Sequence, residues 1–274
     1  MKPINMIRNR LNGLLAAGAA LLQLAACDKK ELCYEHPHNA LVQVEFDWAE
    51  APKANPATMS LYLFPESGAE PMRYEFTNRA GGTISVPYGV YDAVCLNSDQ
   101  ETHRLVNKER METFEVTTHS TRTLQGALRS KSDTAPLARG AEEERSVQEP
   151  DSLWTAHTER ITVLPDAEGQ RLVMAPRSRV IACTVEVRNV ENFSQAQAIS
   201  ASVTGMAGGW MPGIDRLTDE KVTIPFEVEA NADKTVLTAR LSFFGHCPGE
   251  AGRHKVMIYA QMTDGSTYFL EEDV

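Results

Sequence analysis

The sequence predicts an all-β protein made of antiparallel β-sandwiches. Over short runs, apolar residues alternate with polar ones, which is the period of a strand that buries one face. Clusters of Gly, Pro, Asn, Asp and Ser separate these runs at short intervals, a spacing typical of sandwiches and barrels. No strong amphipathic helix pattern competes with these strands, and the best candidate for a helix is the segment 101–112.

The first 26 residues predict a secretory signal peptide. Lys2, Arg8 and Arg10 give a basic start, and residues 11–26 follow as an apolar run without a charge. This run is shorter than the about 20 residues that a membrane-spanning helix needs. Its small residues stand directly before Cys27, which resembles the bacterial lipobox. We therefore expect removal of residues 1–26 and lipidation of Cys27; a plain signal peptide that precedes a cysteine is the alternative.

Residues 27–40 are expected to be a tether, and residues 41–168 a first sandwich domain. The clearest strand of this domain covers 42–48, where every second residue is apolar. Further strands are predicted at 59–64, 72–76, 83–86, 90–96, 113–118 and 160–164. Residues 125–151 carry charges, Ser, Gly and Pro but scarcely any bulky apolar side chain, so they are expected to form a mobile linker or loop.

Residues 169–274 are predicted to form a second sandwich domain. Its strands are expected at 181–187, 222–228, 237–243, 256–262 and 268–270. Pro225 lacks the N–H that a ladder needs, so its strand should be an edge or contain a bulge there. Asp264 and Gly265 form a hairpin turn signal before the last strand. Two alternatives stay open for this ending: the sandwich is short of a strand, or its last strand is donated to another chain.

The charge pattern argues against nucleic acid as a partner. The formal net charge of −10 becomes −13 once residues 1–26, with three positive and no negative side chains, are removed. Nucleic-acid binding needs clustered Lys and Arg, which replace the counterions of the phosphates. No second apolar run approaches membrane-spanning length, so the acylated Cys27 is the membrane attachment that we expect.

The other four cysteines do not form a recognisable site. Cys33, Cys95, Cys183 and Cys247 include no Cys-x-x-Cys pair, which argues against a zinc ribbon or a thioredoxin-like centre. Four cysteines allow three disulfide connectivities, and their spacing does not choose among them. Cys95 and Cys183 lie in apolar strand-like runs, so we expect buried free thiols at both positions.

Motifs for catalysis are missing, so we expect no enzyme, no cofactor and no metal site. The sequence has no H-E-x-x-H, G-x-S-x-G, S-x-x-K or Walker loop. Cys33, His36 and His38 are close in sequence, but a zinc site would need a fourth ligand, and we favour a tether that docks onto the first domain. Trp210, in a glycine-rich loop, is the candidate for ligand binding; it would stack on a carbohydrate or fold back onto a sheet.

Several segments together resemble a known group of surface proteins. They are the lipobox, the tether 31–38, the turn 87–92 and the segment 203–207, and they are similar to Bacteroidetes fimbrillin-like lipoproteins of the type V pilin superfamily, in a branch of unknown function. The resemblance implies two tandem transthyretin-like antiparallel β-sandwich domains. It also implies a lipid-anchored protein of the outer membrane, exposed at the cell surface, that serves as anchor or accessory subunit of a pilus or adhesive assembly.

The resemblance further implies that pilin subunits are partners through β-strand addition. In polymerising members, an arginine-specific protease removes the first strand. Here no arginine lies between Cys27 and Arg73, so one such cut cannot release the first strands alone. We therefore expect a protein that stays anchored. A surface lipoprotein that binds glycans is the alternative.

Overall fold

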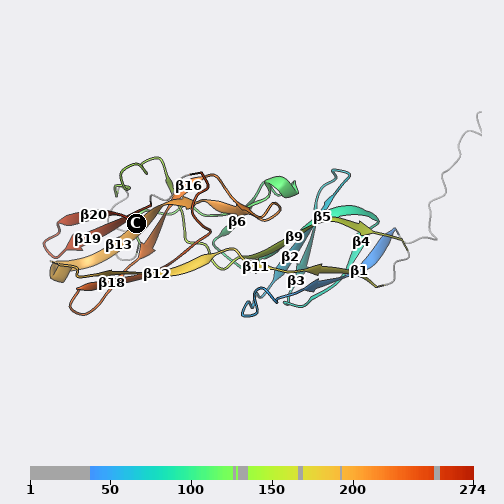
Figure 1. The fold of residues 1–274 in the computed structure, drawn as a ribbon, viewed down its shortest axis with the longest axis horizontal. Helices are drawn as coiled ribbons and strands as arrows, with labels where there is room; N and C mark the ends of the chain where they lie inside the picture. Colours follow the sequence, from blue (N-terminus) through green and yellow to red (C-terminus); the bar gives the residue numbers. More distant parts are fainter. Residues whose placement is uncertain (1–37, 126–127, 129–134, 166–168, 192, 250–253) are drawn as a thin grey trace, which may run out of the picture. The chain divides into compact units, whose positions relative to one another are not determined.

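The protein is almost entirely β, as the computed structural model in Figure 1 shows. The structure describes residues 38–125, 128, 135–165, 169–191, 193–249 and 254–274, and residues 39–274 form one compact unit. No α-helix occurs within these ranges, which contain short 3-10 turns such as η1 (Met111–Thr113) and η3 (Phe193–Gln195). No helix in them is long and apolar enough to cross a membrane. The all-β prediction is confirmed.

The N-terminal strands form two sheets that enclose one core. The three-stranded sheet has the order β10–β1–β4 and consists of β1 (Asn39–Phe46), β4 (Gly81–Pro87) and β10 (Gln170–Met174). The five-stranded sheet has the order β11–β9–β5–β2–β3 and consists of β2 (Met59–Pro65), β3 (Met72–Phe76), β5 (Gly89–Asn97), β9 (Trp154–Val163) and β11 (Arg177–Ser178). Val44 of β1 and Leu61 of β2, both fully buried, belong to the shared core, as the alternation in β1 predicts for Val44.

The N-terminal set of strands ends later in the chain than the sequence indicated. β10 runs parallel to β1, with Leu172 opposite Val44, and β11 pairs with β9. Residues 170–178 therefore belong to the N-terminal sheets, although we expected a second domain from residue 169. The pairing joins segments that lie far apart in the sequence, and the alternation within each strand does not encode it. A division into two domains stays a proposal.

The C-terminal strands form a second pair of facing sheets. The three-stranded sheet, order β12–β18–β17, consists of β12 (Ile181–Arg188), β17 (Glu229–Ala230) and β18 (Val236–Phe243). The five-stranded sheet, order β20–β19–β13–β16–β8, consists of β8 (Arg145–Ser146), β13 (Ala196–Ala207), β16 (Lys221–Glu227), β19 (Lys255–Met262) and β20 (Thr267–Asp273). Ile224, Phe226 and Leu237 are buried between the two sheets. β8 pairs with Val222 and Thr223, so β16 is an edge at Pro225 within the described chain, as predicted.

A smaller sheet connects the two halves of the chain. Its order is β15–β14–β7–β6, and it consists of β6 (His103–Val106), β7 (Glu115–Thr118), β14 (Gly209–Met211) and β15 (Arg216–Leu217). Phe114 and Val116 are fully buried in its core, where Tyr62 and Phe64 of β2 also pack. The segment 101–112, our candidate for a helix, forms β6 and the start of η1 instead, because tertiary pairing outweighs local propensity.

The described parts of the expected linker 125–151 make specific contacts. Leu128 and Ala138 are buried with Tyr259 of β19 on the outer face of the five-stranded C-terminal sheet. The Tyr259 hydroxyl donates a hydrogen bond to the carbonyl oxygen of Pro136 at 2.8 Å. A few small apolar side chains are thus enough to cover one face of a sheet, and the expected mobility of this segment stays a prediction.

Candidate docking groove

The two C-terminal sheets differ in width, and this leaves part of their core uncovered. The wider sheet ends in β20, and the facing three-stranded sheet ends in β12. Tyr268 and Leu270 of β20 lie opposite Ala260 and Ile258 of β19, and directly opposite residues of an antiparallel pair share a face. Ile258 is buried in the core, so Tyr268 and Leu270 are on the core-facing side. They are nevertheless 59% and 44% exposed.

An apolar cavity of about 610 Å³ opens beside β12. Cys183 and Val185 of β12 line it on one side, and Val256 of β19 lines it on the other. The core-facing residues of β12 are half-buried, because β12 is an edge strand and no strand of the described chain pairs with its free edge. We use the name docking groove for two features: this cavity, and the exposed core-facing side of Tyr268 and Leu270, which do not line the cavity itself.

Two histidines lie at the cavity and contact each other. His246 Nδ1 is 2.7 Å from His254 Nε2, and His254 Nδ1 is 2.9 Å from the carbonyl oxygen of Thr204. A carbonyl oxygen only accepts, so His254 Nδ1 carries the proton and donates. When both rings are neutral, His254 Nε2 accepts from His246 Nδ1, which leaves His246 Nε2 as an acceptor. The groove thus contains one polar site in an apolar lining.

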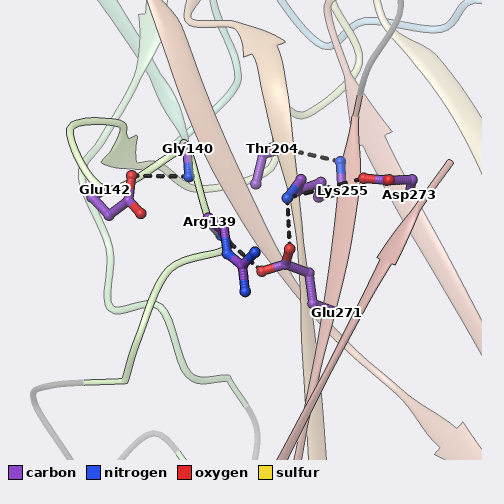
Figure 2. Close-up of polar contacts among 7 residues, drawn as sticks. All are labelled: Arg139, Gly140, Glu142, Thr204, Lys255, Glu271 and Asp273. Atoms are coloured by element: carbon purple, nitrogen blue, oxygen red, sulfur yellow. Dashed lines mark hydrogen bonds and ion pairs between the residues drawn. The ribbon is translucent and has the colours of Figure 1, made fainter.

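The opposite face of β20 is held by a polar network, which Figure 2 shows. The backbone N–H of Arg139 donates to Glu271 Oε2 at 2.8 Å, and Lys255 Nζ donates to Glu271 Oε1 at 2.6 Å. Lys255 Nζ also lies 4.0 Å from Asp273 Oδ1. The Arg139 N–H and then the Lys255 ammonium hold the pKa of Glu271 below its usual value. β20 is therefore fixed on its outer face while its core-facing side stays open.

The residues that we singled out from the sequence lie elsewhere. Cys27, with the whole signal and most of the tether, lies outside the described residues, so its lipidation stays a prediction. Trp210 of β14 is partly buried against the core of the four-stranded sheet, and the guanidinium of Arg179 lies 4.8 Å from its ring centroid. This cation covers one face of the indole. Stacking of a carbohydrate on Trp210 stays a prediction. It would have to use the opposite face of the indole ring.

Two of the three described cysteines, Cys95 and Cys183, lie in different environments. Cys95 is fully buried, and burial raises its pKa to about 12, as expected for a structural thiol. Cys183 is only half-buried and lines the groove; burial and then the nearby Glu149 raise its pKa. The sequence reasoning assigned both to buried positions and missed the groove. Alternation in β12 predicts which side chains face inward, but not whether another strand covers them.

Comparison with known proteins identifies the family of this chain. The model of the family described as "Domain of unknown function (DUF5119)" matches residues 26–227. The chain belongs to this family. It is also 24% identical over 231 residues to Fim4B of Bacteroides ovatus, a candidate fimbrium anchoring subunit, in an alignment that covers 83% of this chain. The chain spans only 64% of the length of that relative.

Solved structures share the fold. A candidate adhesin from Bacteroides ovatus has a TM-score of 0.67 at 19% identity, with 91% of this chain and 87% of that chain covered. The fimbrial anchor protein Mfa2 from Porphyromonas gingivalis has a TM-score of 0.52 at 13% identity, with coverage of 86% and 82%. The all-β fold that the fimbrillin-like resemblance implied is therefore confirmed, whereas its division into two tandem domains stays a proposal.

Proposed function

We propose that this protein is a lipid-anchored anchor or accessory subunit of a pilus or adhesive assembly at the cell surface, and that its docking groove accepts a β-strand of another pilus subunit. The observation that carries the proposal is the uncovered core-facing side of Tyr268 and Leu270. The names of the related anchor proteins and the fimbrillin-like fold support it. The proposed role is non-enzymatic.

Strand addition would correct the mismatch in width between the two sheets. A strand placed beside β12 would extend the three-stranded sheet and cover the inner face of β20. Its alternate apolar side chains would enter the cavity beside Cys183 and Val185, and its backbone would pair with the open edge of β12. Edge pairing supplies hydrogen bonds, and the apolar lining selects side chains.

The reactivity of Cys183 reports directly whether a strand occupies the docking groove. Maleimide at pH 8 should modify Cys183 in the free protein, and pilus subunits purified from the same cells should protect it. Mapping the modified peptides by mass spectrometry separates Cys183 from the other cysteines. Equal labelling of Cys183 with and without saturating pilus subunits contradicts strand binding in the groove.

A matched pair of variants tests the location. Val185→Arg puts a charge on the core-facing side of β12, and Thr184→Arg puts it on the exposed side one residue away. We expect Val185→Arg to abolish binding of pilus subunits and Thr184→Arg to retain it. The same loss in both variants would show that the outer side of β12, rather than the groove, makes the contact.

The membrane part of the proposal depends on Cys27. Growth with an alkyne-labelled fatty acid should label the wild-type protein, and Cys27→Ala should remove the label and release the protein from the membrane fraction. Cys33→Ala is the matched control, because it leaves the lipobox intact. Retention of the label in Cys27→Ala would refute the assignment.

A further inference from the structure

The core-facing side of β20 carries one charged residue among its apolar ones. Glu272 lies opposite Val256 of β19, just as Leu270 lies opposite Ile258, and directly opposite residues of an antiparallel pair share a face. Val256 packs against the core between the two C-terminal sheets. Glu272 is therefore on the same side of β20 as Tyr268 and Leu270, and like them it is exposed.

Glu272 stands between the two features of the docking groove. Leu270, two residues before it, belongs to the exposed core-facing side, and Val274, two residues after it, lines the cavity. The N–H of Val274 donates to the carbonyl oxygen of His254 at 2.9 Å, which continues the pairing of β20 with the segment before β19. A strand that covers Leu270 and also enters the cavity must therefore pass over Glu272.

No cation of the described chain is in place to neutralise Glu272 once it is covered. Its carboxylate makes no hydrogen bond or ion pair with a described residue. Lys255 of β19 lies on the opposite side of the sheet, where its ammonium is ion-paired with Glu271 and lies 4.0 Å from Asp273. The described lining of the cavity contains two histidines but neither Lys nor Arg. A docked strand would thus remove water from a carboxylate without a positive partner.

Covering an unpaired carboxylate is unfavourable. The free-energy cost of taking a charged group out of water is recovered only when an opposite charge pairs with it. Stacked sheets lie about 10 Å apart, and the side chains of Lys and Arg are long enough to meet a Glu side chain across this gap. Their apolar stems can cover apolar surface at the same time. The partner strand is therefore the source from which a neutralising cation would come.

We propose that the strand accepted by the docking groove carries a Lys or Arg on its inward side, and that this cation forms an ion pair with Glu272. The inference rests on the proposed strand binding and adds the chemistry of the partner to it. Side chains on one side of a strand recur every second residue, so the cation should lie two residues from the apolar side chain that covers Leu270. The net charge of −10 of this chain would also attract a basic strand.

The first test measures how purified pilus subunits protect Cys183 of the mature full chain from maleimide. We expect the subunit concentration for half-maximal protection to rise roughly 10- to 30-fold in Glu272→Gln, because the cation of the strand then loses its partner. Asp273→Asn is the matched control: it removes the same charge one residue away, on the other side of β20, and should behave like wild type. Glu272→Gln alters an exposed side chain, so its thermal unfolding should match that of wild type.

Synthetic peptides test the sign of the charge. The probes are three peptides of about nine residues, the length of a strand, in which Val alternates with Thr and one central Val is replaced by Lys, Gln or Glu. Binding is again measured as protection of Cys183. We expect wild type to bind the Lys peptide most tightly and the Glu peptide most weakly, and Glu272→Lys to reverse this order.

The outcomes separate this inference from the proposed function. Equal or stronger protection by the subunits in Glu272→Gln would refute the ion pair and leave strand binding in place. The same would follow from one order of peptide affinities in both wild type and Glu272→Lys. An equal loss in Glu272→Gln and Asp273→Asn would show a general effect of charge and also overturn the inference. If neither subunits nor peptides protect Cys183 in wild type, strand binding itself fails, and the inference fails with it.

Discussion

Removing the uncovered apolar side chains of β20 should weaken strand binding by a predictable amount. Full burial of a Leu side chain stabilises by about 1.5–3 kcal/mol, and a strand that covers Leu270 would bury the 44% that is exposed. Leu270→Ala should therefore cost roughly 1 kcal/mol of binding free energy. Tyr268 is 59% exposed, so the double variant Tyr268→Ala/Leu270→Ala should cost about 2 kcal/mol, or roughly 30-fold in affinity.

The assay is the concentration of purified pilus subunits that gives half-maximal protection of Cys183 from maleimide. Phe269→Ala is the control, because Phe269 is on the same strand and 50% exposed but faces the other way, against Tyr259. We expect wild-type protection in this control. An unchanged midpoint in the double variant, or an equal shift in Phe269→Ala, would refute the reasoning that the core-facing side of β20 is the binding surface.

Three further predictions concern stability and reactivity. Asn97→Leu should lower the free energy of urea unfolding by about 2–5 kcal/mol, because the buried amide bonds two backbone groups of segment 152–154 that would lose their partner. Burial raises the pKa of Glu149, so folding favours its protonated form and stability should fall as pH rises above about 4.5; Glu149→Gln should reduce this fall. Maleimide should modify Cys183 well before Cys95, which needs unfolding to react.

Each of these predictions has a result that contradicts it. Asn39→Leu removes an exposed amide and should change the unfolding free energy by less than about 0.5 kcal/mol, so a similar loss in both Asn variants would show that burial is not the cause. If the unfolding free energy has the same pH dependence in wild type and Glu149→Gln, then the titration of Glu149 does not cause that dependence. Equal rates at the two thiols would contradict the buried position of Cys95.

Individual strands were predictable because their signal is local. Val42, Val44 and Phe46 alternate with polar residues, and β1 buries these side chains together with Ala40. Pro225 likewise indicated an open edge, because its missing N–H is a property of the residue itself. The contacts of the segment 125–151 were not predictable for the opposite reason: Leu128 and Ala138 are too sparse to show a period, and they are buried against residues far away in the chain, such as Tyr259.

The sequence by itself determined the strands with clear alternation, their inward faces, the acidic charge and the resemblance to fimbrillin-like proteins, but it did not indicate β13. Tertiary structure alone decided which strands pair and how wide each sheet becomes, and this is what leaves Tyr268 and Leu270 uncovered. It also brought His246 to His254 and buried the Tyr62 hydroxyl without a hydrogen-bond partner among the described residues. The physical reason is that alternation fixes the direction of a side chain within its own strand, whereas exposure depends on neighbours supplied by distant parts of the chain.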